Sequence, residues 1–210
     1  MRKKTLDTEI RILDYSMELF LKFGYSRVST DEIAHNLGAS KKTIYNYYPS
    51  KKDILIAGIN RFKKELSADV DQILKNKKLS FPEKLQQNMT VVALRLSTIT
   101  THFGEDLRKN VPDVWSDLSK YKKEAALMHF TRLLNEGEKS GHINKKINKH
   151  IAVVIYMTAI ENLLDPLFIN NLPAEITENI PYTANEIFNS IVRVIYEGIL
   201  SVGTKKRMSK

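Results

Sequence analysis

The sequence predicts an all-α protein with a small N-terminal domain, residues 1–52, and a larger helical domain, residues 53–210. Three observations predict this fold class. Apolar residues recur at helical spacing along most of the chain, whereas clean two-residue alternation is rare. The chain has 8 glycines and 6 prolines, and they stand where the predicted helices begin or end. Its 210 residues, 42% of them hydrophobic, suffice for one or two compact domains with a real core.

The charge of the chain favours a polyanionic partner. The formal net charge is +9, with a pI of about 9.5, which points to nucleic acid before an anionic membrane. Residues 1–52 contain ten Lys or Arg against six Asp or Glu, so this quarter of the chain carries +4 of the total. No cysteine is present, which excludes disulfides, thiolate metal ligands and a cysteine nucleophile.

Targeting signals are weak in this sequence, and we expect a cytoplasmic protein with no membrane partner. Residues 1–10 are basic and then polar, without the apolar segment of a signal peptide. The most apolar run, residues 151–160, is far shorter than the roughly 20 residues that a membrane span needs.

The first three predicted helices are short and closely spaced. The first runs from Asp7 to Phe23, with an apolar face opposite a charged one, and stops at a glycine suited to the left-handed conformation. Ser29 and Glu32 form a capping box at the start of the second, which Gly38 ends. Ser40 caps the third, which extends to about Tyr47 because Pro49 disfavours helix in the residue before it.

Two short helices joined by a glycine-containing turn form a helix-turn-helix, whose second helix enters the major groove of DNA. Four apolar side chains can pack inward: Ile33, Ala34, Leu37 and Ile44. The outward face then carries Lys41, Lys42, Thr43, Tyr45, Asn46 and Tyr47. Lysine donates to guanine edges, a threonine methyl meets the thymine methyl, and tyrosine hydroxyls reach phosphates. Lys51 begins the next helix, whose free N–H groups also suit phosphate. The alternative is a small helical bundle with solvated lysines.

Residues 12–55 resemble the DNA-binding domain of TetR-type transcriptional repressors. The matching features, in chain order, are Leu19-Phe20, Gly24-Tyr25, Ser29-Thr30, Ile33-Ala34, Gly38, Ser40-Lys41, Thr43, Tyr45, Tyr47-Tyr48, Ser50-Lys51 and Leu55. Two positions depart from the usual pattern: Tyr48 stands where phenylalanine is common, and Pro49 stands where lysine is common. The second departure removes one possible phosphate contact.

The resemblance implies a bacterial protein that binds palindromic double-stranded DNA operators as a homodimer and usually represses. It also implies that a small-molecule effector, bound in the larger helical domain, releases the DNA. Matching positions would inherit the DNA contacts: Thr30, Lys41, Thr43, Tyr45, Tyr47 and Lys51. Helix geometry adds Lys42 and Asn46 to that set. No cofactor and no metal is implied.

The helix signals continue through the rest of the chain. The expected helices are residues 50–75, 80–100, a short one within 101–107, 112–141, 148–169 with Pro166 kinking or ending it, and 183–200. The last two are apolar on more than one face, through Ile151, Val154, Ile155, Ile187, Ile191, Val194 and Ile195. These residues are either buried within one subunit or form a dimer interface of two helices from each subunit, which the resemblance favours.

Candidate ligand contacts are His102, Phe103, Trp115 and Tyr121, which lie in the region where the family has its small-molecule cavity. A mostly apolar cavity with few polar groups suits a small, largely apolar ligand, but aromatic residues at helical spacing also form plain core.

No catalytic residue is predicted. The chain has no Gly-rich phosphate loop, HExxH or GxSxG motif, and the single Glu32-to-His35 spacing lies within the helix-turn-helix. The other class left open is a helical small-molecule-binding or architectural DNA-binding protein without operator specificity.

Overall fold

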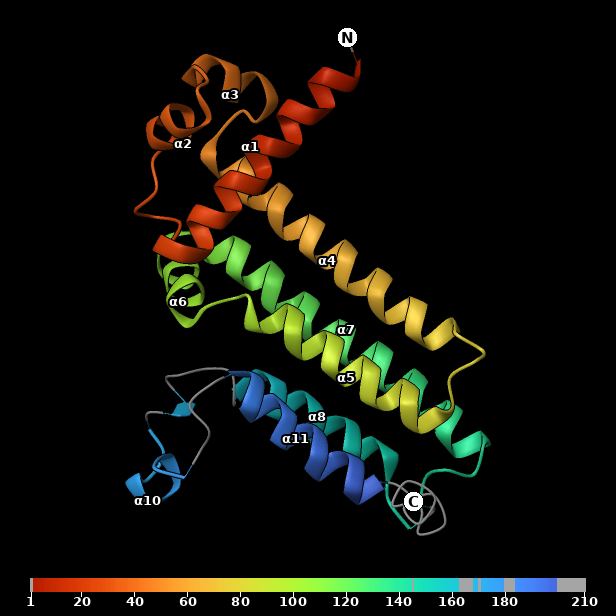
Figure 1. Cartoon of the computed structure of the whole chain (residues 1–210). Helices are drawn as coiled ribbons and strands as arrows, with labels where there is room; N and C mark the ends of the chain where they lie inside the picture. The colour runs from red at the N-terminus through yellow and green to blue at the C-terminus, as the bar shows by residue number, and fades with distance from the viewer. Residues whose placement is uncertain (1, 145, 163–167, 170, 180–183, 200–210) are drawn as a thin grey trace. The chain divides into compact units, whose positions relative to one another are not determined.

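The structure is a computed structural model that describes residues 2–144, 146–162, 168–169, 171–179 and 184–199. Within these ranges, every element of the fold is a helix (Figure 1). They are α1 (Arg2–Phe23), α2 (Thr30–Leu37), α3 (Lys41–Tyr47), α4 (Lys51–Lys75), α5 (Phe81–Ser97), α6 (Thr101–Asn110), α7 (Pro112–Lys139), α8 (Lys149–Asn162), α10 (Ala174–Thr177) and α11 (Ala184–Ile199). The predicted all-α class is confirmed.

The helices form two compact units. The N-terminal unit comprises Met1–Glu65 and Thr98–Ser119, and the C-terminal unit comprises Leu66–Ser97 and Lys120–Lys210. Helices α4 and α7 each contribute residues to both units. The predicted division after residue 52 concerns functional domains and stays a prediction.

The N-terminal unit packs around the side of α1 that the sequence predicts to be apolar. Within it, α1 contacts α2 and α6, and α2 contacts α3 (Figure 1). Phe20 is fully buried, and its ring meets that of Tyr25 edge to face, with centroids 5.3 Å apart. Ile33 of α2 and Ile44 of α3 reach the same core, so this core fixes the orientation of both short helices.

The C-terminal unit has its own core, in which α11 packs against α5 and α8. Leu85, Met89, Phe130 and Leu133 are buried there. Lys84 is also buried, because its ammonium has two acceptors: the Leu74 carbonyl at 3.0 Å and a Glu136 carboxylate oxygen at 2.6 Å. Two of the three N–H donors of this buried ammonium are therefore satisfied.

Helix boundaries depart from the sequence prediction at a few places with physical causes. Helix α1 begins at Arg2 instead of Asp7, since nothing in residues 2–6 stops a helix. Helix α5 ends at Ser97 instead of Thr100, because Thr100 caps α6 by accepting a hydrogen bond from the backbone N–H of Phe103. The short α10 was not predicted. Pro166, Thr183 and Leu200, used in predicting the last two helices, lie outside the described residues.

Candidate nucleic-acid interface and ligand cavity

Side chains of the predicted caps hold α2 and α3 at their N-termini. Ser29 Oγ accepts a hydrogen bond from the Glu32 N–H at 3.1 Å, and Ser40 Oγ accepts one from the Thr43 N–H at 3.0 Å. Between the helices, Gly38 has φ of 62°. A β-carbon there would meet nothing within 4 Å, so the left-handed backbone is what the turn requires of this residue. The sequence therefore fixes this turn locally.

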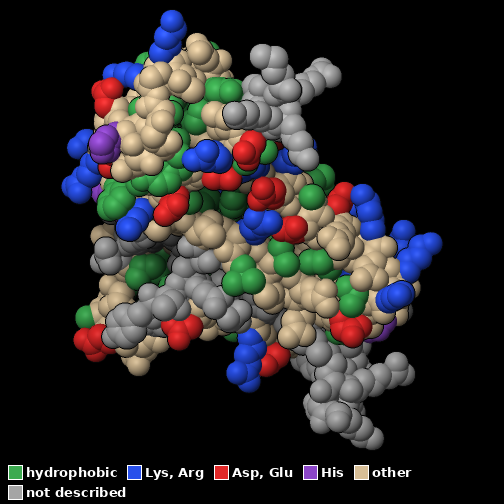
Figure 2. Space-filling model, turned by 45° about the horizontal axis from the view of Figure 1, so that its top comes forward, with side chains coloured by type: hydrophobic (Ala, Val, Ile, Leu, Met, Phe, Trp, Pro, Cys, Tyr) green, Lys and Arg blue, Asp and Glu red, His purple; other side chains and the backbone are tan. Residues whose placement is uncertain are grey.

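The inward and outward faces of α3 divide as predicted. Ile44 is fully buried, whereas Lys41, Lys42, Tyr45 and Asn46 are exposed. Thr43 and Tyr47 are half-buried, and Thr43 shares a hydrogen bond with the Ser40 hydroxyl. In the space-filling view, Lys and Arg side chains lie at the surface in the upper left, where α2 and α3 lie, with acidic side chains between them (Figure 2).

Among the described residues, Lys41 is the one lysine of this face that forms an ion pair. Its ammonium lies 2.9 Å from an Asp31 carboxylate oxygen, and this hydrogen bond, with the attraction of the carboxylate, raises the pKa of Lys41. Both side chains are exposed, so the pair contributes little to stability and can exchange one anionic partner for another. A phosphate or base acceptor can therefore replace Asp31.

Thr30 and Lys51 are less accessible than the sequence alone indicates. Thr30 is buried at the start of α2. The Lys51 ammonium donates to the Tyr25 and Val28 carbonyls, at 2.9 and 2.8 Å, and lies 4.2 Å from the centroid of the Tyr25 ring. Burial lowers the pKa of Lys51, and the carboxylate of Asp106 opposes that effect. This lysine thus fixes the segment between α1 and α2.

Helix α6 is attached to the end of α1 through three polar side chains. Thr100 Oγ1 donates to the Leu21 carbonyl at 3.1 Å, and His102 Nε2 lies 3.2 Å from the Phe23 carbonyl. Asp106 accepts a hydrogen bond from the Ser26 N–H at 2.7 Å, and its pKa is lowered by its hydrogen bonds although burial opposes this. His102, predicted as a ligand contact, is an exposed residue that supports this joint.

The four predicted ligand contacts are divided between the two units. Phe103 is buried in the core of the N-terminal unit, and Trp115 packs against the same core, with its ring close to Gly104. Tyr121 belongs to the C-terminal unit, where it lines an internal cavity of about 30 Å³. Its hydroxyl shares a 2.9 Å hydrogen bond with Ser67. Of the four, Tyr121 alone is placed at this cavity.

The cavity lies between α4, α5, α7 and α8 and is mostly apolar. Its lining comprises Leu66, Val70, Asn88, Val92, Leu96, Tyr121, Lys122, Ala125, Ala126, His129, Phe130 and Tyr156. Phe130 and Tyr156 stack with ring centroids 4.2 Å apart. Burial raises the pKa of Tyr156, so its hydroxyl keeps its proton. An apolar wall with few polar groups is typical of small-molecule sites.

Two buried polar residues of this cavity were missed by sequence reasoning, Asn88 and His129. They are 2% and 8% exposed. Asn88 Nδ2 and both ring nitrogens of His129 have no hydrogen-bond partner among the described residues. The helical pattern could have identified His129, because it stands four residues after Ala125 and four before Leu133, both of them buried.

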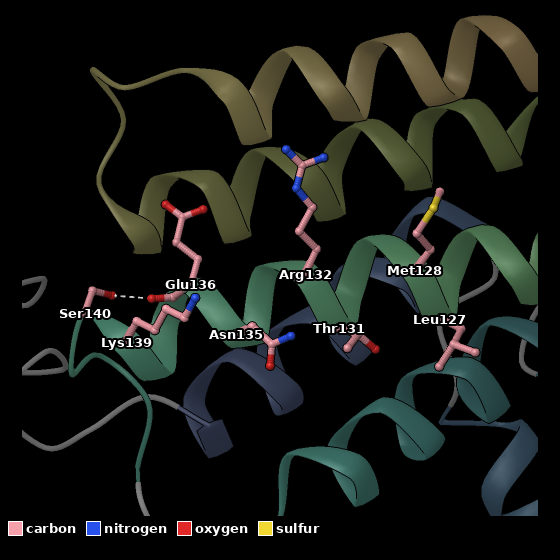
Figure 3. Close-up of a pocket in the computed structure, with 8 residues that line it drawn as sticks. All are labelled: Leu127, Met128, Thr131, Arg132, Asn135, Glu136, Lys139 and Ser140. Atoms are coloured by element: carbon pink, nitrogen blue, oxygen red, sulfur yellow. Dashed lines mark hydrogen bonds between the residues drawn. The ribbon is translucent and has the colours of Figure 1, made fainter.

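A second hollow lies on the surface of α7 and is open to solvent (Figure 3). Its lining comes almost entirely from this one helix: Leu127, Met128, Thr131, Arg132, Asn135, Glu136, Lys139 and Ser140. Arg132 is paired with Asp71 at 3.0 Å, and Glu136 is paired with Lys84. A ligand here would be covered on one side only, so the enclosed cavity is the better small-molecule site.

The predicted dimer-interface residues divide between surface and core. Ile151, Val154 and Ile155 of α8 are more than half exposed, and Val194 of α11 is 73% exposed. Ile191 is buried and Ile187 is half-buried, while the side chain of Ile195 lies outside the described residues. Helices α8 and α11 therefore expose large apolar side chains while they pack on each other.

Within the described ranges, no group of three or more His, Cys, Asp or Glu could hold a metal ion. The same residues include no helix that is both long and apolar enough to cross a membrane.

Comparisons with known proteins agree with this geometry. The model of the family described as bacterial regulatory proteins, tetR family, matches residues 12–57. An uncharacterized HTH-type transcriptional regulator of Bacillus subtilis (strain 168), YvaF, is 29% identical over 189 residues, which are 90% of this chain and 94% of the relative.

Solved structures share the fold along nearly the whole chain. A transcriptional regulator of the TetR/AcrR family from Thermobifida fusca is 22% identical with a TM-score of 0.64, over 91% of this chain and 98% of that one. The fatty acid degradation regulator FadR from Bacillus halodurans is 21% identical with a TM-score of 0.60, over 90% and 95% of the two chains.

The capped helix-turn-helix on its apolar core, followed by a larger helical unit, defines a DNA-binding transcriptional regulator. Residues 12–57 match the tetR family of bacterial regulatory proteins, and the chain is similar over nearly its whole length to an HTH-type transcriptional regulator. Members of this family bind DNA and small-molecule effectors, act as dimers and are not typically enzymes.

Proposed function

We propose that this protein is a repressor that binds a palindromic operator as a homodimer in the cytoplasm and leaves it when a small, largely apolar ligand binds. The outward face of α3 carries the proposal. It exposes two lysines, a tyrosine and an asparagine on a helix whose orientation is fixed by a buried isoleucine and a serine cap. Positive and hydrogen-bonding side chains on a rigid helix are what major-groove reading requires.

The DNA contacts divide by chemistry. Lys41, Lys42, Thr43, Tyr45 and Asn46 face outward enough to reach base edges or nearby phosphates.

Thr30, Tyr47 and Lys51 serve the DNA backbone. The Lys51 ammonium already has two carbonyl acceptors, which supports a role in placing the start of α4 against phosphate through the free N–H groups of that helix. Functional domains at residues 1–52 and 53–210 follow from this assignment.

The homodimer is supported by the exposed apolar side chains of α8 and α11. Val154 and Val194 project into solvent from the single chain, together with Ile151 and Ile155. A palindromic operator needs two recognition helices about 34–36 Å apart, or one helical turn further. A second copy that covers α8 and α11 would supply the second recognition helix.

The ligand site is the enclosed cavity of the C-terminal unit, whose lining is mostly apolar. Helix α4 contributes Leu66 and Val70 to that lining, and its first residues belong to the N-terminal unit. A ligand that displaces α4 at the cavity therefore acts on the same helix that follows the helix-turn-helix. By linkage, a ligand favoured by the displaced state weakens operator binding by the same factor.

Selection from random duplexes tests the proposal without knowledge of the genes involved. The purified protein should enrich one palindrome and prefer it over random DNA by on the order of 10³-fold at fixed salt. Footprinting of the promoter next to its own gene should then protect that palindrome. Enrichment of no sequence, with tight binding to every duplex, would establish an architectural DNA-binding protein instead.

A further inference from the structure

Two polar side chains that line the cavity have nitrogen atoms without a hydrogen-bond partner among the described residues. Asn88 and His129 lie on different helices, α5 and α7, and both line the same enclosed cavity. Each is more than nine-tenths buried, and three of their nitrogen atoms have no partner among the described residues. Buried polar groups without partners are rare in native proteins, and each one indicates an unseen partner or a function.

The nearby charged and polar groups do not supply the missing partners. Asp71 and Arg132, which influence the pKa of His129, are bonded to each other, and Asp71 also accepts from Lys75. The Tyr121 hydroxyl is engaged with Ser67. Since burial lowers the pKa of His129, its ring is neutral near pH 7 and presents one N–H donor and one acceptor nitrogen.

Most of the remaining wall is apolar, although Tyr121 and Lys122 also line it. One part of the wall is aliphatic and consists of Leu66, Val70, Val92 and Leu96. Another part consists of the stacked rings of Phe130 and Tyr156. Its volume of about 30 Å³ has room for roughly one or two water molecules on the usual measure. A larger ligand must therefore enlarge the cavity. Such a ligand binds a state of the unit with an open cavity more tightly than a state with a closed one.

We infer that the effector has a compact apolar body and one uncharged hydrogen-bond-accepting head, such as a carbonyl, which Asn88 and His129 bind by donating to its oxygen. The inference rests on the proposed ligand control and specifies its chemistry. The two residues that line this cavity offer two N–H donors, which match the two lone pairs of a carbonyl oxygen. An anionic head is disfavoured at Asn88 and His129, because a neutral imidazole and an amide do not compensate its charge.

Three isosteric probes test the head group directly. Acetophenone carries the carbonyl, α-methylstyrene replaces its oxygen with a methylene group, and benzoate replaces its methyl with an anionic oxygen. Calorimetry should show acetophenone binding about tenfold more tightly than α-methylstyrene, the worth of an ordinary net hydrogen bond. Benzoate should bind more weakly than acetophenone. Equal affinities of acetophenone and α-methylstyrene, or no binding of any probe up to its solubility, would overturn the inference.

Benzoate binding tightest would also overturn it and would identify Lys122, which lines the same cavity, as the recognition group. The three-probe comparison needs only the unmodified protein, so it decides even if a variant fails to fold. The ratio of the affinities for acetophenone and α-methylstyrene should fall to near one in Asn88→Leu and in His129→Phe. It should persist in the control Leu96→Met, which alters the same wall without changing a polar group.

A second measurement needs no ligand. Replacing an unpaired buried polar group with an apolar one of similar shape removes its desolvation cost, so Asn88→Leu or His129→Phe should raise Tm by about 2–4 °C. A fall in Tm for both variants would show that the two side chains serve the fold, with bound water as their partner.

Failure of this inference differs from failure of the proposed function. If the protein selects no operator but still prefers acetophenone, the cavity assignment holds and ligand-controlled repression does not. If it selects an operator but the probes are not distinguished, repression holds and the head-group assignment does not.

Discussion

The recognition helix and the ligand cavity satisfy their polar groups in opposite ways. Around α3, Ser29, Ser40 and Lys51 bond to backbone groups, so the surface is held in place without DNA. In the cavity, Asn88 and His129 are buried without partners. The polar groups around α3 are therefore paired within the chain, whereas those of the cavity are available to a ligand.

This difference is local and does not reflect loose packing of the whole C-terminal unit. The same unit buries Lys84 with two acceptors, and Asp69 accepts hydrogen bonds from two guanidinium nitrogens of Arg95. Among the described residues of the N-terminal unit there is one exception, since Ser16 Oγ on α1 is buried without a partner. Unpaired groups that gather at one cavity indicate a ligand more strongly than a single isolated hydroxyl does.

The largest expected effect concerns the exposed apolar surface of the C-terminal unit. Val154→Glu combined with Val194→Glu should place two charges in the proposed interface, yield monomers and lower operator affinity by on the order of 10³-fold, to the non-specific level. Light scattering and duplex titration measure the two effects. Met128→Glu is the matched control, because Met128 is as exposed as Val154 but lies on α7.

A native mass near one chain, 24.2 kDa, for the unmodified protein at micromolar concentration would rule out the dimer. Dissociation by the Met128 control instead would move the interface to the surface of α7.

The next effect compares two adjacent lysines of the N-terminal unit. Lys51→Met removes hydrogen bonds to two backbone carbonyls and should lower the free energy of unfolding by about 1.5–3 kcal/mol. Lys52→Met removes only an exposed ion pair with Asp113 and should cost less than about 1 kcal/mol. Urea unfolding followed by circular dichroism gives both values. Equal costs for the two substitutions would contradict the structural role assigned to Lys51.

A third effect separates reading from folding at α3. Lys41→Ala should leave stability nearly unchanged, because its ion pair with Asp31 is exposed. It should nevertheless reduce discrimination at particular base pairs by about 1–3 kcal/mol. Titration of the operator and its single-base variants measures this loss. A uniform loss of affinity for operator and random DNA would assign Lys41 to phosphate instead.

The same contrast explains what the sequence could predict. Helices α2 and α3 depend on neighbours within a few residues: serine caps, a glycine turn and apolar spacing. Their bounds and inward residues were therefore predictable. The cavity depends on which faces of α5, α7 and α8 meet. The family resemblance and the aromatic side chains directed attention to Trp115 and Phe103, which pack in the other unit.

The smallest expected effect is a dependence of stability on pH that originates in the cavity. Burial lowers the pKa of His129 from its ordinary value of 6.5; nearby Asp71 opposes this and Arg132 adds to it. Above pH 6.5 the ring is neutral in both the folded and the unfolded chain, so its titration does not change the free energy of unfolding there. As the pH falls below 6.5, the unfolded chain binds a proton that the folded one resists, so the free energy of unfolding decreases.

Urea unfolding at intervals from about pH 7.5 to 5.5 isolates this contribution, because carboxylates titrate mainly below that range. The unmodified protein should lose stability toward pH 5.5, and His129→Phe should lose less. The matched variant Asn88→Leu alters the same cavity without a titrating group and should keep the full dependence. If His129→Phe and the unmodified protein show parallel pH profiles, the ring is solvated or paired in solution. The contrast between the unpaired polar groups of the cavity and the paired groups around α3 would then be wrong.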